Sequence, residues 1–550
     1  MFRGAYLFEM EQDQNQPESQ DVSVVRASTA ITPLIAKTFQ GLEPLLAQEL
    51  TELGASDIQI GRRMVSFTGD KEMLYRANFC LRTAIRVLKP IKQFKAKSAE
   101  DVYAAVKTID WSEYLSADKT FAVDSVVFSP EFHHSKFVAY KVKDAIADQF
   151  RERTGTRPNV SVSNPDIQLH IHVSDYDATL ALDSSGESLH RRGYRKETVA
   201  APLNEVLAAG IIMMTGWKGE TDFLDPFCGS GTLCIEAALI ARGIAPGVFR
   251  KNYAFEKWPD FDADLFERIY NDDSNERDFN HHIYGRDIDL ITVGIARRNV
   301  KAAGLAKDIT IDEGDFTRVP LIQGSQPMPI IVTNPPYGER ISSPDLLGLY
   351  KTIGQKLKHE FSGGEAWVLS YREECFEQIG LKPSLKTPLY NGSLECELRK
   401  YVMFDGRLNQ HMASGGTVKT DMERSQMAEK HRFKQKRPSF KYGSRDDEEL
   451  DEDQHRFNKF SRKEHFGRWD DERHGHRRDS DRPRGGSRDE YRPRGGNNED
   501  RRFKGKGGSR DGYRSRDSLH DDYRAHGDSR SARQEARRRF FGGETDDASS

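Results

Sequence analysis

Cysteine is scarce in this chain, which has 550 residues and 5 cysteines, at positions 80, 228, 234, 375 and 396. They form no C-x-x-C pair and match no metal-site spacing, so we expect reduced thiols, no disulfide framework and no bound metal. No apolar run reaches the length that crosses a membrane, and no signal peptide is recognisable. These absences favour a cytoplasmic protein without a membrane partner.

Charge is unevenly distributed along the chain. From residue 411 onward 35 Lys and Arg stand against 29 Asp and Glu, a net charge of +6, whereas the first 410 residues hold 48 against 57, a net charge of −9. The segment 411–550 is dominated by Arg, Asp, Gly and Ser and has too few apolar residues to offset the entropy of ordering. We therefore predict a disordered tail, and the polar residues 1–30 are predicted to be disordered for the same reason. Whether translation starts at Met1 or at Met10 stays open.

Hydrophobic periodicity between these two segments predicts three folded units. Residues 31–95 alternate strand and helix patterns in a small α+β unit with a ferredoxin-like order, and residues 96–186 form a second α+β unit. Residues 187–200 are a basic linker. Residues 201–404 alternate strands and helices, so we expect a Rossmann-like α/β domain there.

The α/β unit contains a strand, a glycine turn and a helix in succession. An apolar strand ends at Asp225, and the turn Pro226–Gly231 leads into a helical run that begins near Thr232. Gly229 and Gly231 permit a tight turn and a close approach of a ligand to the backbone. Asp225 stands at the carboxyl end of its strand, where open α/β sheets bind ligands. Such a turn occurs in many nucleotide-binding folds and does not identify the ligand.

A second buried strand, Ile330–Thr333, runs into Asn334-Pro335-Pro336-Tyr337. The two prolines stiffen this loop and hold its polar groups in place. Because this strand is also expected in the parallel sheet, its carboxyl end should lie at the same edge as Asp225.

Two more predicted strands end close to acids. Asp287 ends the strand that follows the glycine turn, and Asp315 follows the third strand. Asp289 lies two residues beyond the first of these acids, and Asp312 and Glu313 precede the second, so both assignments could shift by a few residues.

The linker contains a cluster of cations around one aromatic residue, in Leu189–Lys196. Arginine matches phosphate oxygens and tyrosine can stack on a base, so Arg191, Arg192, Tyr194 and Arg195 are candidate RNA contacts. A solvated hinge between domains explains the same residues equally well.

The interval 243–282 is longer than a plain Rossmann unit requires and is rich in aromatic residues. It is either an inserted, partly helical segment that covers the substrate side or a simple packing insertion. The aromatic residues are Phe249, Tyr253, Phe255, Trp258, Phe261 and Phe266.

The glycine loop and the Asn-Pro-Pro-Tyr loop together resemble the cofactor and catalytic loops of class I S-adenosylmethionine-dependent methyltransferases that modify exocyclic amino groups. Residues 137–150, followed by Gly155-Thr156-Arg157-Pro158, resemble a THUMP domain, an RNA-binding module. Over residues 31–404 the chain resembles the THUMP-containing rRNA methyltransferases of the large subunit methyltransferase L type. Besides the two loops, the stretches that carry this resemblance are Leu189–Arg195 and Leu389–Gly392.

The resemblance implies S-adenosylmethionine as the cofactor and gives roles to the loop residues. Asn334, Pro335 and Tyr337 would be catalytic, since the Asn side-chain oxygen and the Pro carbonyl can accept the hydrogens of the amine while Tyr stacks on a flipped base. Asp287 would bond the ribose hydroxyls and Asp315 the adenine amino group. The full set of implied cofactor-binding residues is Asp225, Phe227, Gly229, Gly231, Asp287, Asp315 and Asn334.

The same resemblance implies methylation of a guanine N2 in large-subunit (23S) ribosomal RNA. Because the target base must leave its stack, we expect rRNA that is not yet fully assembled into a ribosome as the partner. Asn-Pro-Pro-Tyr is shared with adenine-N6 and cytosine-N4 enzymes, so a tRNA guanine-N2 methyltransferase and a DNA adenine methyltransferase are alternatives. A different class of alternative is a non-catalytic RNA-binding assembly factor that works through its tail. The sequence indicates neither the target nucleotide nor the oligomeric state.

The tail generates a first prediction. Its Arg-Gly repeats with spaced Tyr and Phe are typical of nonspecific RNA-binding segments, although a solubilising role is the alternative. Removing residues 415–550 should leave the melting temperature unchanged, lower RNA affinity and flatten its dependence on salt. Thermal unfolding and RNA titrations of both chains test this, and a large drop in melting temperature would mean that the tail packs on the folded part.

Overall fold

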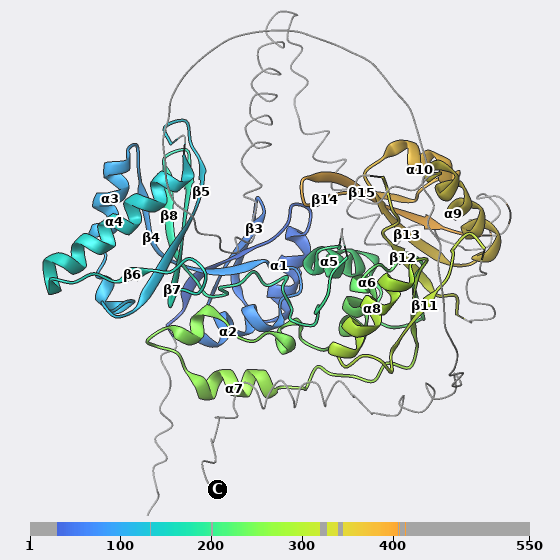
Figure 1. The fold of residues 1–550 in the computed structure, drawn as a ribbon, viewed down its shortest axis with the longest axis horizontal. Helices are drawn as coiled ribbons and strands as arrows, with labels where there is room; N and C mark the ends of the chain where they lie inside the picture. Colours follow the sequence, from blue (N-terminus) through green and yellow to red (C-terminus); the bar gives the residue numbers. More distant parts are fainter. Residues whose placement is uncertain are drawn as a thin grey trace, which may run out of the picture. The chain divides into compact units, whose positions relative to one another are not determined.

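The computed structural model describes residues 30–132, 134–199, 202–318, 327–338 and 345–404, together with residues 406 and 413. The predictions for 1–30 and 411–550 therefore lie almost entirely outside the described residues. These residues form two mixed β-sheets with helices packed against them (Figure 1).

The N-terminal sheet has eight strands in the order β2-β3-β1-β4-β8-β7-β5-β6. β4 pairs antiparallel with β8, from Leu88 opposite Asp183 to Lys95 opposite Asp177. The two α+β units expected at 31–95 and 96–186 thus share one continuous sheet. The strands are β1 Thr32–Lys37, β2 Ser56–Gly61, β3 Met64–Gly69, β4 Arg86–Lys95, β5 Thr120–Phe128, β6 Asn159–Val160, β7 Ile167–Ser174 and β8 Asp177–Asp183.

Local sequence signals account for the helix ends of this half. Ser98 and Asp101 form a reciprocal capping box at the start of α3, and Gly155 ends α4 with φ of 72°, where a side chain would be strained. α3 and α4 pack against each other beside the sheet (Figure 1). The helices are α1 Glu43–Glu52, α2 Lys71–Cys80, α3 Ala99–Lys107 and α4 Ser135–Thr154, with a 3-10 turn at Trp111–Glu113.

The second sheet has seven strands in the order β11-β10-β9-β12-β13-β15-β14. β11, β10, β9, β12 and β13 are parallel, whereas β15 and β14 are antiparallel additions. From β9 the chain continues to β10 on one side and later returns to β12 on the other, so the strand order reverses between β9 and β12. Open α/β sheets bind ligands at such a reversal, beyond the carboxyl ends of the strands. The strands are β9 Phe223–Asp225, β10 Ile283–Asp287, β11 Ile309–Glu313, β12 Ile330–Thr333, β13 Glu365–Ser370, β14 Leu385–Asn391 and β15 Leu394–Val402.

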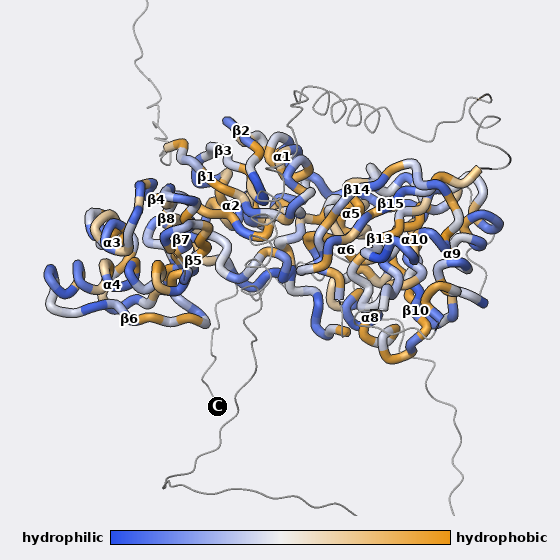
Figure 2. Tube along the Cα trace, turned by 90° about the horizontal axis from the view of Figure 1, so that it is seen from above, coloured by the Kyte–Doolittle hydropathy of each residue, from blue (hydrophilic) through white to orange (hydrophobic). Residues whose placement is uncertain are grey.

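Apolar helices fill the core of this half. The tube in Figure 2 is mostly hydrophobic along α5 and α6, and all ten residues of α6 are buried. The helices are α5 Glu205–Thr215, α6 Thr232–Ala241, α7 Ala263–Asn271, α8 Leu290–Ala302, α9 Leu346–Glu360 and α10 Glu373–Ile379, with 3-10 turns at Pro246–Phe249 and Ala254–Lys257.

The aromatic interval 243–282 packs against the N-terminal sheet's helix α2. Phe255 stacks on Tyr75 with ring centroids 4.4 Å apart, and Tyr270 lies 5.5 Å from Phe79. Of the two interpretations left open, these contacts favour the packing insertion.

In the described part of the chain, no helix combines the length and apolarity needed to cross a membrane. Within the same residues, no group of three His, Cys, Asp or Glu side chains is placed to hold a metal ion. All five cysteines are free thiols.

Candidate active site

The glycine turn between β9 and α6 uses two glycines in conformations that other residues rarely adopt. Gly229 has φ of 54°, and Gly231, which precedes α6, has φ of 81°. The Gly229 N–H donates to Asp287 Oδ2 at 3.1 Å, so the turn is tied to the end of β10.

Asp225 joins the glycine turn to the end of β12. Its side chain is 1% exposed, and its Oδ1 accepts hydrogen bonds from Thr333 Oγ1 at 2.7 Å and from the Phe227 N–H at 3.2 Å. Burial raises the pKa of Asp225 to about 7, helped by the nearby charge of Asp287 and opposed by these two hydrogen bonds. The acid therefore holds the two loops together at the strand reversal.

Asp287 and Asp289 have different partners, although they are two residues apart. Asp289 caps α8, since its Oδ2 accepts from the Thr292 N–H at 3.0 Å and from Thr292 Oγ1 at 2.6 Å. Asp287 is half-buried beside the glycine turn, and burial raises the pKa of its carboxyl group. Of the two, Asp287 is the acid next to the turn.

Asp315 is engaged in a local turn beyond β11. Its Oδ1 accepts from the Thr317 N–H at 2.8 Å and from Thr317 Oγ1 at 2.7 Å, and its Oδ2 lies 3.3 Å from Arg318 Nε. The hydrogen bonds that Thr317 donates lower the pKa of the Asp315 carboxyl group. The neighbouring Phe316 is buried against Phe227 of the glycine turn, with ring centroids 5.0 Å apart.

The Asn-Pro-Pro-Tyr loop follows β12 directly. The Asn334 side-chain oxygen is buried and has no hydrogen-bond partner among the described residues. Pro335 is buried, and Tyr337 accepts a hydrogen bond from Asn391 Nδ2 at 2.8 Å. The Tyr337 ring meets Tyr371 edge-on, with centroids 5.3 Å apart and planes at 81°. The loop, which directly follows Thr333, thus holds a buried hydrogen-bond acceptor, the Asn334 oxygen, and a ring in a fixed orientation, that of Tyr337.

The linker residues are not arranged as the predicted RNA contact. Arg192 and Tyr194 are 2% and 1% exposed, and both face Glu236 of α6, at 3.5 Å from Arg192 Nε and 2.8 Å from Tyr194 Oη. Arg195 is mostly buried and donates to the Leu203 carbonyl and to Thr232 Oγ1, each at 2.7 Å.

Only Arg191 of the four predicted contacts is exposed, and it pairs with Glu187 at 2.7 Å. The prediction for Arg192 and Tyr194 is therefore wrong, because a buried carboxylate takes up their polar groups. The signal that could have revealed this is the single Glu in the otherwise uncharged helix Thr232–Ala241.

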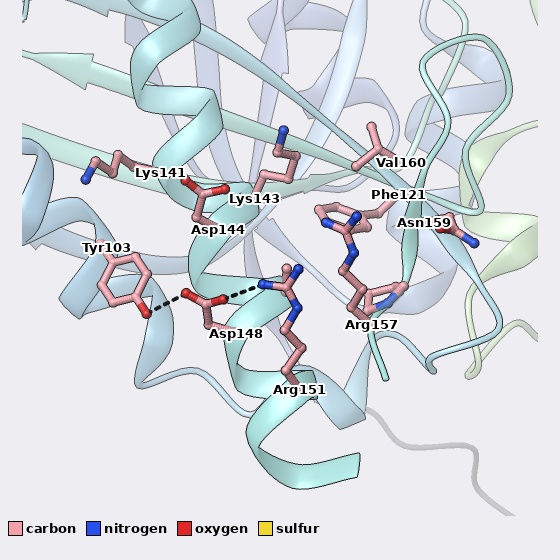
Figure 3. A pocket seen from close by; sticks show the side chains of 12 residues that line it. Tyr103, Phe121, Lys141, Lys143, Asp144, Asp148, Arg151, Arg157, Asn159 and Val160 are labelled. Carbon is pink, nitrogen blue, oxygen red and sulfur yellow. Dashed lines mark hydrogen bonds and ion pairs between the residues drawn. The ribbon is translucent and has the colours of Figure 1, made fainter. Parts of the chain in front are cut away.

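A basic cleft of about 590 Å³ lies beside α4 (Figure 3). Asp148 accepts from Tyr103 Oη at 3.0 Å and from Arg151 Nη1 at 3.1 Å. Lys143 and Arg157 also line the cleft, and within the described residues neither has an ion-pair partner. Its complete lining is Tyr103, Phe121, Lys141, Lys143, Asp144, Ala147, Asp148, Arg151, Arg157, Pro158, Asn159 and Val160.

Three families match successive parts of the chain. The RlmL ferredoxin-like domain matches residues 33–88, the THUMP domain residues 96–183, and the RMKL-like methyltransferase domain residues 192–400. The first two cover the N-terminal sheet, and the third covers the second sheet with both loops of the candidate site.

Two relatives are similar over most of the folded part. The Synechocystis sp. protein slr0064, an RNA methyltransferase by name, is 39% identical over 389 residues, which are 70% of this chain and 100% of that protein. The ribosomal RNA large subunit methyltransferase K/L of Syntrophotalea carbinolica is 40% identical over 381 residues, 67% of this chain and 53% of that protein. This chain thus aligns with about half the length of the second relative.

Among solved structures, SMU.472 in complex with SAH, a methyltransferase by name, is similar in fold and sequence. The TM-score is 0.62 and the identity 30%, over 69% of this chain and 100% of that chain.

Replacing Arg192 by Ala should destabilise the protein strongly, because the buried Glu236 carboxylate would lose its cation. Removing one partner of a buried pair costs about 3–5 kcal/mol. Arg191→Ala removes the adjacent exposed arginine and is the matched control, with an unchanged melting temperature expected. Thermal unfolding of both variants is the measurement. An Arg192→Ala protein with the melting temperature of the wild type would contradict the structural role of Arg192.

Proposed function

Because the chain belongs to the family of THUMP-domain, S-adenosylmethionine-dependent RNA methyltransferases, we propose that it methylates the N2 amino group of a guanine in large-subunit ribosomal RNA. The proposal concerns the base, the atom and the class of RNA. It places the protein in the cytoplasm, with incompletely assembled ribosomal RNA as its partner.

The residues at the strand reversal fit the cofactor of the family. The glycine turn has no side chains at Gly229 and Gly231, so a ligand can approach its backbone closely. The half-buried Asp287 carboxylate is suited to accept hydrogen bonds from two ribose hydroxyls. Phe227 and Phe316 form an apolar wall beside the turn, and Asp225 places a buried acid near it. When bound, S-adenosylmethionine supplies an electrophilic methyl group.

The observation that carries the proposal is the unpaired, buried oxygen of Asn334. An exocyclic amine is a poor nucleophile, because its lone pair is delocalised into the ring. Acceptors on its two hydrogens localise that lone pair toward the methyl group, and the Asn334 oxygen and the Pro335 carbonyl are the acceptors we assign. Their position on a stiff loop supplies the orientation that such a reaction needs.

Tyr337 is assigned to stack on the target base. The base must leave its stack to reach Asn334, which costs about a few kcal/mol. Exposed or incompletely assembled RNA should therefore be a better substrate than a mature ribosome.

RNA as the substrate class follows from the family, and large-subunit rRNA is supported by the name of the Syntrophotalea relative. Guanine N2 rests on the resemblance of the loops and of the N-terminal half alone. The cleft beside α4, with Lys143 and Arg157, is a candidate surface for the RNA backbone.

Asp287→Ala should weaken S-adenosylmethionine binding at least tenfold, because it removes the acceptor beside the glycine turn. Asp289→Asn is the matched control, since Asn can keep the cap of α8 while losing the charge. It should bind the cofactor nearly as wild type does. Calorimetric titration of both variants is the measurement, and a larger loss in the Asp289 variant would shift the assignment by two residues.

The product is predicted to be N2-methylguanosine in large-subunit rRNA. Nucleoside mass spectrometry of separated rRNA and tRNA, from cells with and without the gene, should show the loss of one N2-methylguanosine from the rRNA. Re-expression of Asn334→Ala should not restore it, although this variant should keep nearly all of its cofactor affinity, because we assign the Asn334 side-chain oxygen to the base and not to the cofactor's sugar. Loss confined to tRNA or of N6-methyladenosine instead would overturn the proposal, and so would activity of the variant within about tenfold of wild type, roughly 1.4 kcal/mol in barrier.

A further inference from the structure

The hairpin β14–β15 reaches the catalytic loop through a single side chain. Asn391 pairs with Leu394, so the two turn residues are Gly392 and Ser393, and Asn391 is the last residue of β14. Its side-chain N–H donates to Tyr337 Oη at 2.8 Å. The Tyr337 ring is therefore held by Asn391 on one side and by the edge-on contact with Tyr371 on another.

The same hairpin is in close contact with the β1–α1 turn of the N-terminal sheet. A Cβ added at Gly41 would lie 3.1 Å from the Pro388 carbonyl oxygen and 3.2 Å from Leu389 Cδ2. Leu389 is fully buried. A side chain at this position would be crowded by the hairpin and strained, since Gly41 also has φ of 94°.

Glu43 ties the β1–α1 turn to the β2–β3 turn. Its Oε2 accepts from the Gly41 N–H at 2.7 Å and its Oε1 from the Arg63 N–H at 2.9 Å. The Arg63 carbonyl in turn accepts from the Thr38 N–H at 3.0 Å. The β2–β3 turn is thus fixed beside the hairpin by backbone hydrogen bonds that leave its side chains free.

The two arginines of that turn, Arg62 and Arg63, are exposed and have no hydrogen-bond or ion-pair partner for their guanidinium groups within the described residues. Burial and Glu395 raise the pKa of Tyr390, while Arg62 and Arg63 lower it, so both cations lie within electrostatic range of that ring. Tyr390 precedes Asn391. Two unpaired cations thus lie within electrostatic range of the hairpin whose last β14 residue, Asn391, contacts Tyr337.

We propose that the β2–β3 turn is the RNA contact at the mouth of the catalytic site, in which Arg62 and Arg63 bind phosphates of the strand that carries the target base. Asn391 is a positioning residue that holds Tyr337 in the orientation needed for stacking. This assignment rests on the proposed function and replaces the contact expected from residues 191–195. Guanidinium groups pair with phosphate oxygens, and a phosphate-bound strand at this turn lies next to the loop that receives its base.

The double variant Arg62→Gln/Arg63→Gln tests the RNA contact. Lys218→Gln/Arg268→Gln is the matched control, because it removes two exposed cations that lack ion-pair partners within the described residues, on the turn before β9 and on α7. Affinity for in vitro transcribed large-subunit rRNA should fall at least tenfold in the test variant and stay near wild type in the control. The slope of log affinity against log salt should become shallower by about 1.4, as expected for two phosphate contacts to a single strand.

Binding and turnover separate this inference from the proposed function. If the wild type binds the transcript but methylates no RNA, the proposed function fails, while the binding comparison still decides the role of Arg62 and Arg63. Equal RNA affinity and equal salt dependence of the test and control variants would overturn the proposed RNA contact at the β2–β3 turn. The same result is expected if this turn binds an acidic protein and not RNA.

A double-mutant cycle tests Asn391. Asn391→Ala should lower kcat about tenfold with the RNA KM and cofactor affinity unchanged, and it should have no further effect in a Tyr337→Phe background, where the hydroxyl is absent. An equal loss in both backgrounds, or a change in melting temperature alone, would reduce Asn391 to a structural residue. If the wild-type protein transfers no methyl group to RNA, the positioning role of Asn391 also fails, because Tyr337 then has no base to stack on.

Discussion

The carboxylate of Glu236 is the constraint on which the junction between linker, helix and N-terminal sheet depends. It lies in a helix whose ten residues are all buried, and a carboxylate in such surroundings requires compensating donors. Arg192 and Tyr194 both donate to its Oε1, and Arg192 also donates to the carbonyl of Arg82, in the loop before β4. One acid therefore connects three parts of the chain that are far apart in sequence. Arg192 and Tyr194 of the linker are thereby taken up by this acid and lie away from solvent.

Polar groups at the strand reversal are mostly paired with one another. Asp225 accepts from Thr333, Asp287 accepts from Gly229, and Tyr337 accepts from Asn391. These bonds hold the two loops at fixed positions before any ligand arrives. In the Asn-Pro-Pro-Tyr loop itself, the Asn334 side-chain oxygen is buried and has no hydrogen-bond partner among the described residues. A group left unpaired in rigid surroundings is suited to bind an amine without reorganisation, which is the basis of the proposed chemistry.

The parts of the fold and site that could be predicted from the sequence are those with local signals. The order strand, glycine turn, helix around Asp225 and the strand before Asn334 depend on nearby residues, and the structure has both. Failures occurred where the deciding partner is distant. The arginine at 192 resembles a phosphate ligand in the sequence because Glu236 is 44 residues away. The role of the aromatic interval stayed open in the sequence because its partners, Tyr75 and Phe79, are also distant. The dipeptide Asn391-Gly392 is typical of a two-residue turn, whereas the pairing of Asn391 with Leu394 places the turn one position later. The hydrophobic pattern gives little signal for β2, because most of its residues are exposed.

The shared sheet of the N-terminal half makes its two modules physically inseparable. β4 carries Pro90, Lys89, Lys92 and Lys95, features that protect an open sheet edge from pairing with other molecules. β8, with the sequence DATLALD, has no such protection on the side where it pairs with β4, and its other side pairs with β7. A fragment that begins after residue 95 would present β8 as a naked edge and invite self-association. The boundary between the two matched families is therefore a poor place to divide this protein, and the modules are expected to be inherited and folded as one piece.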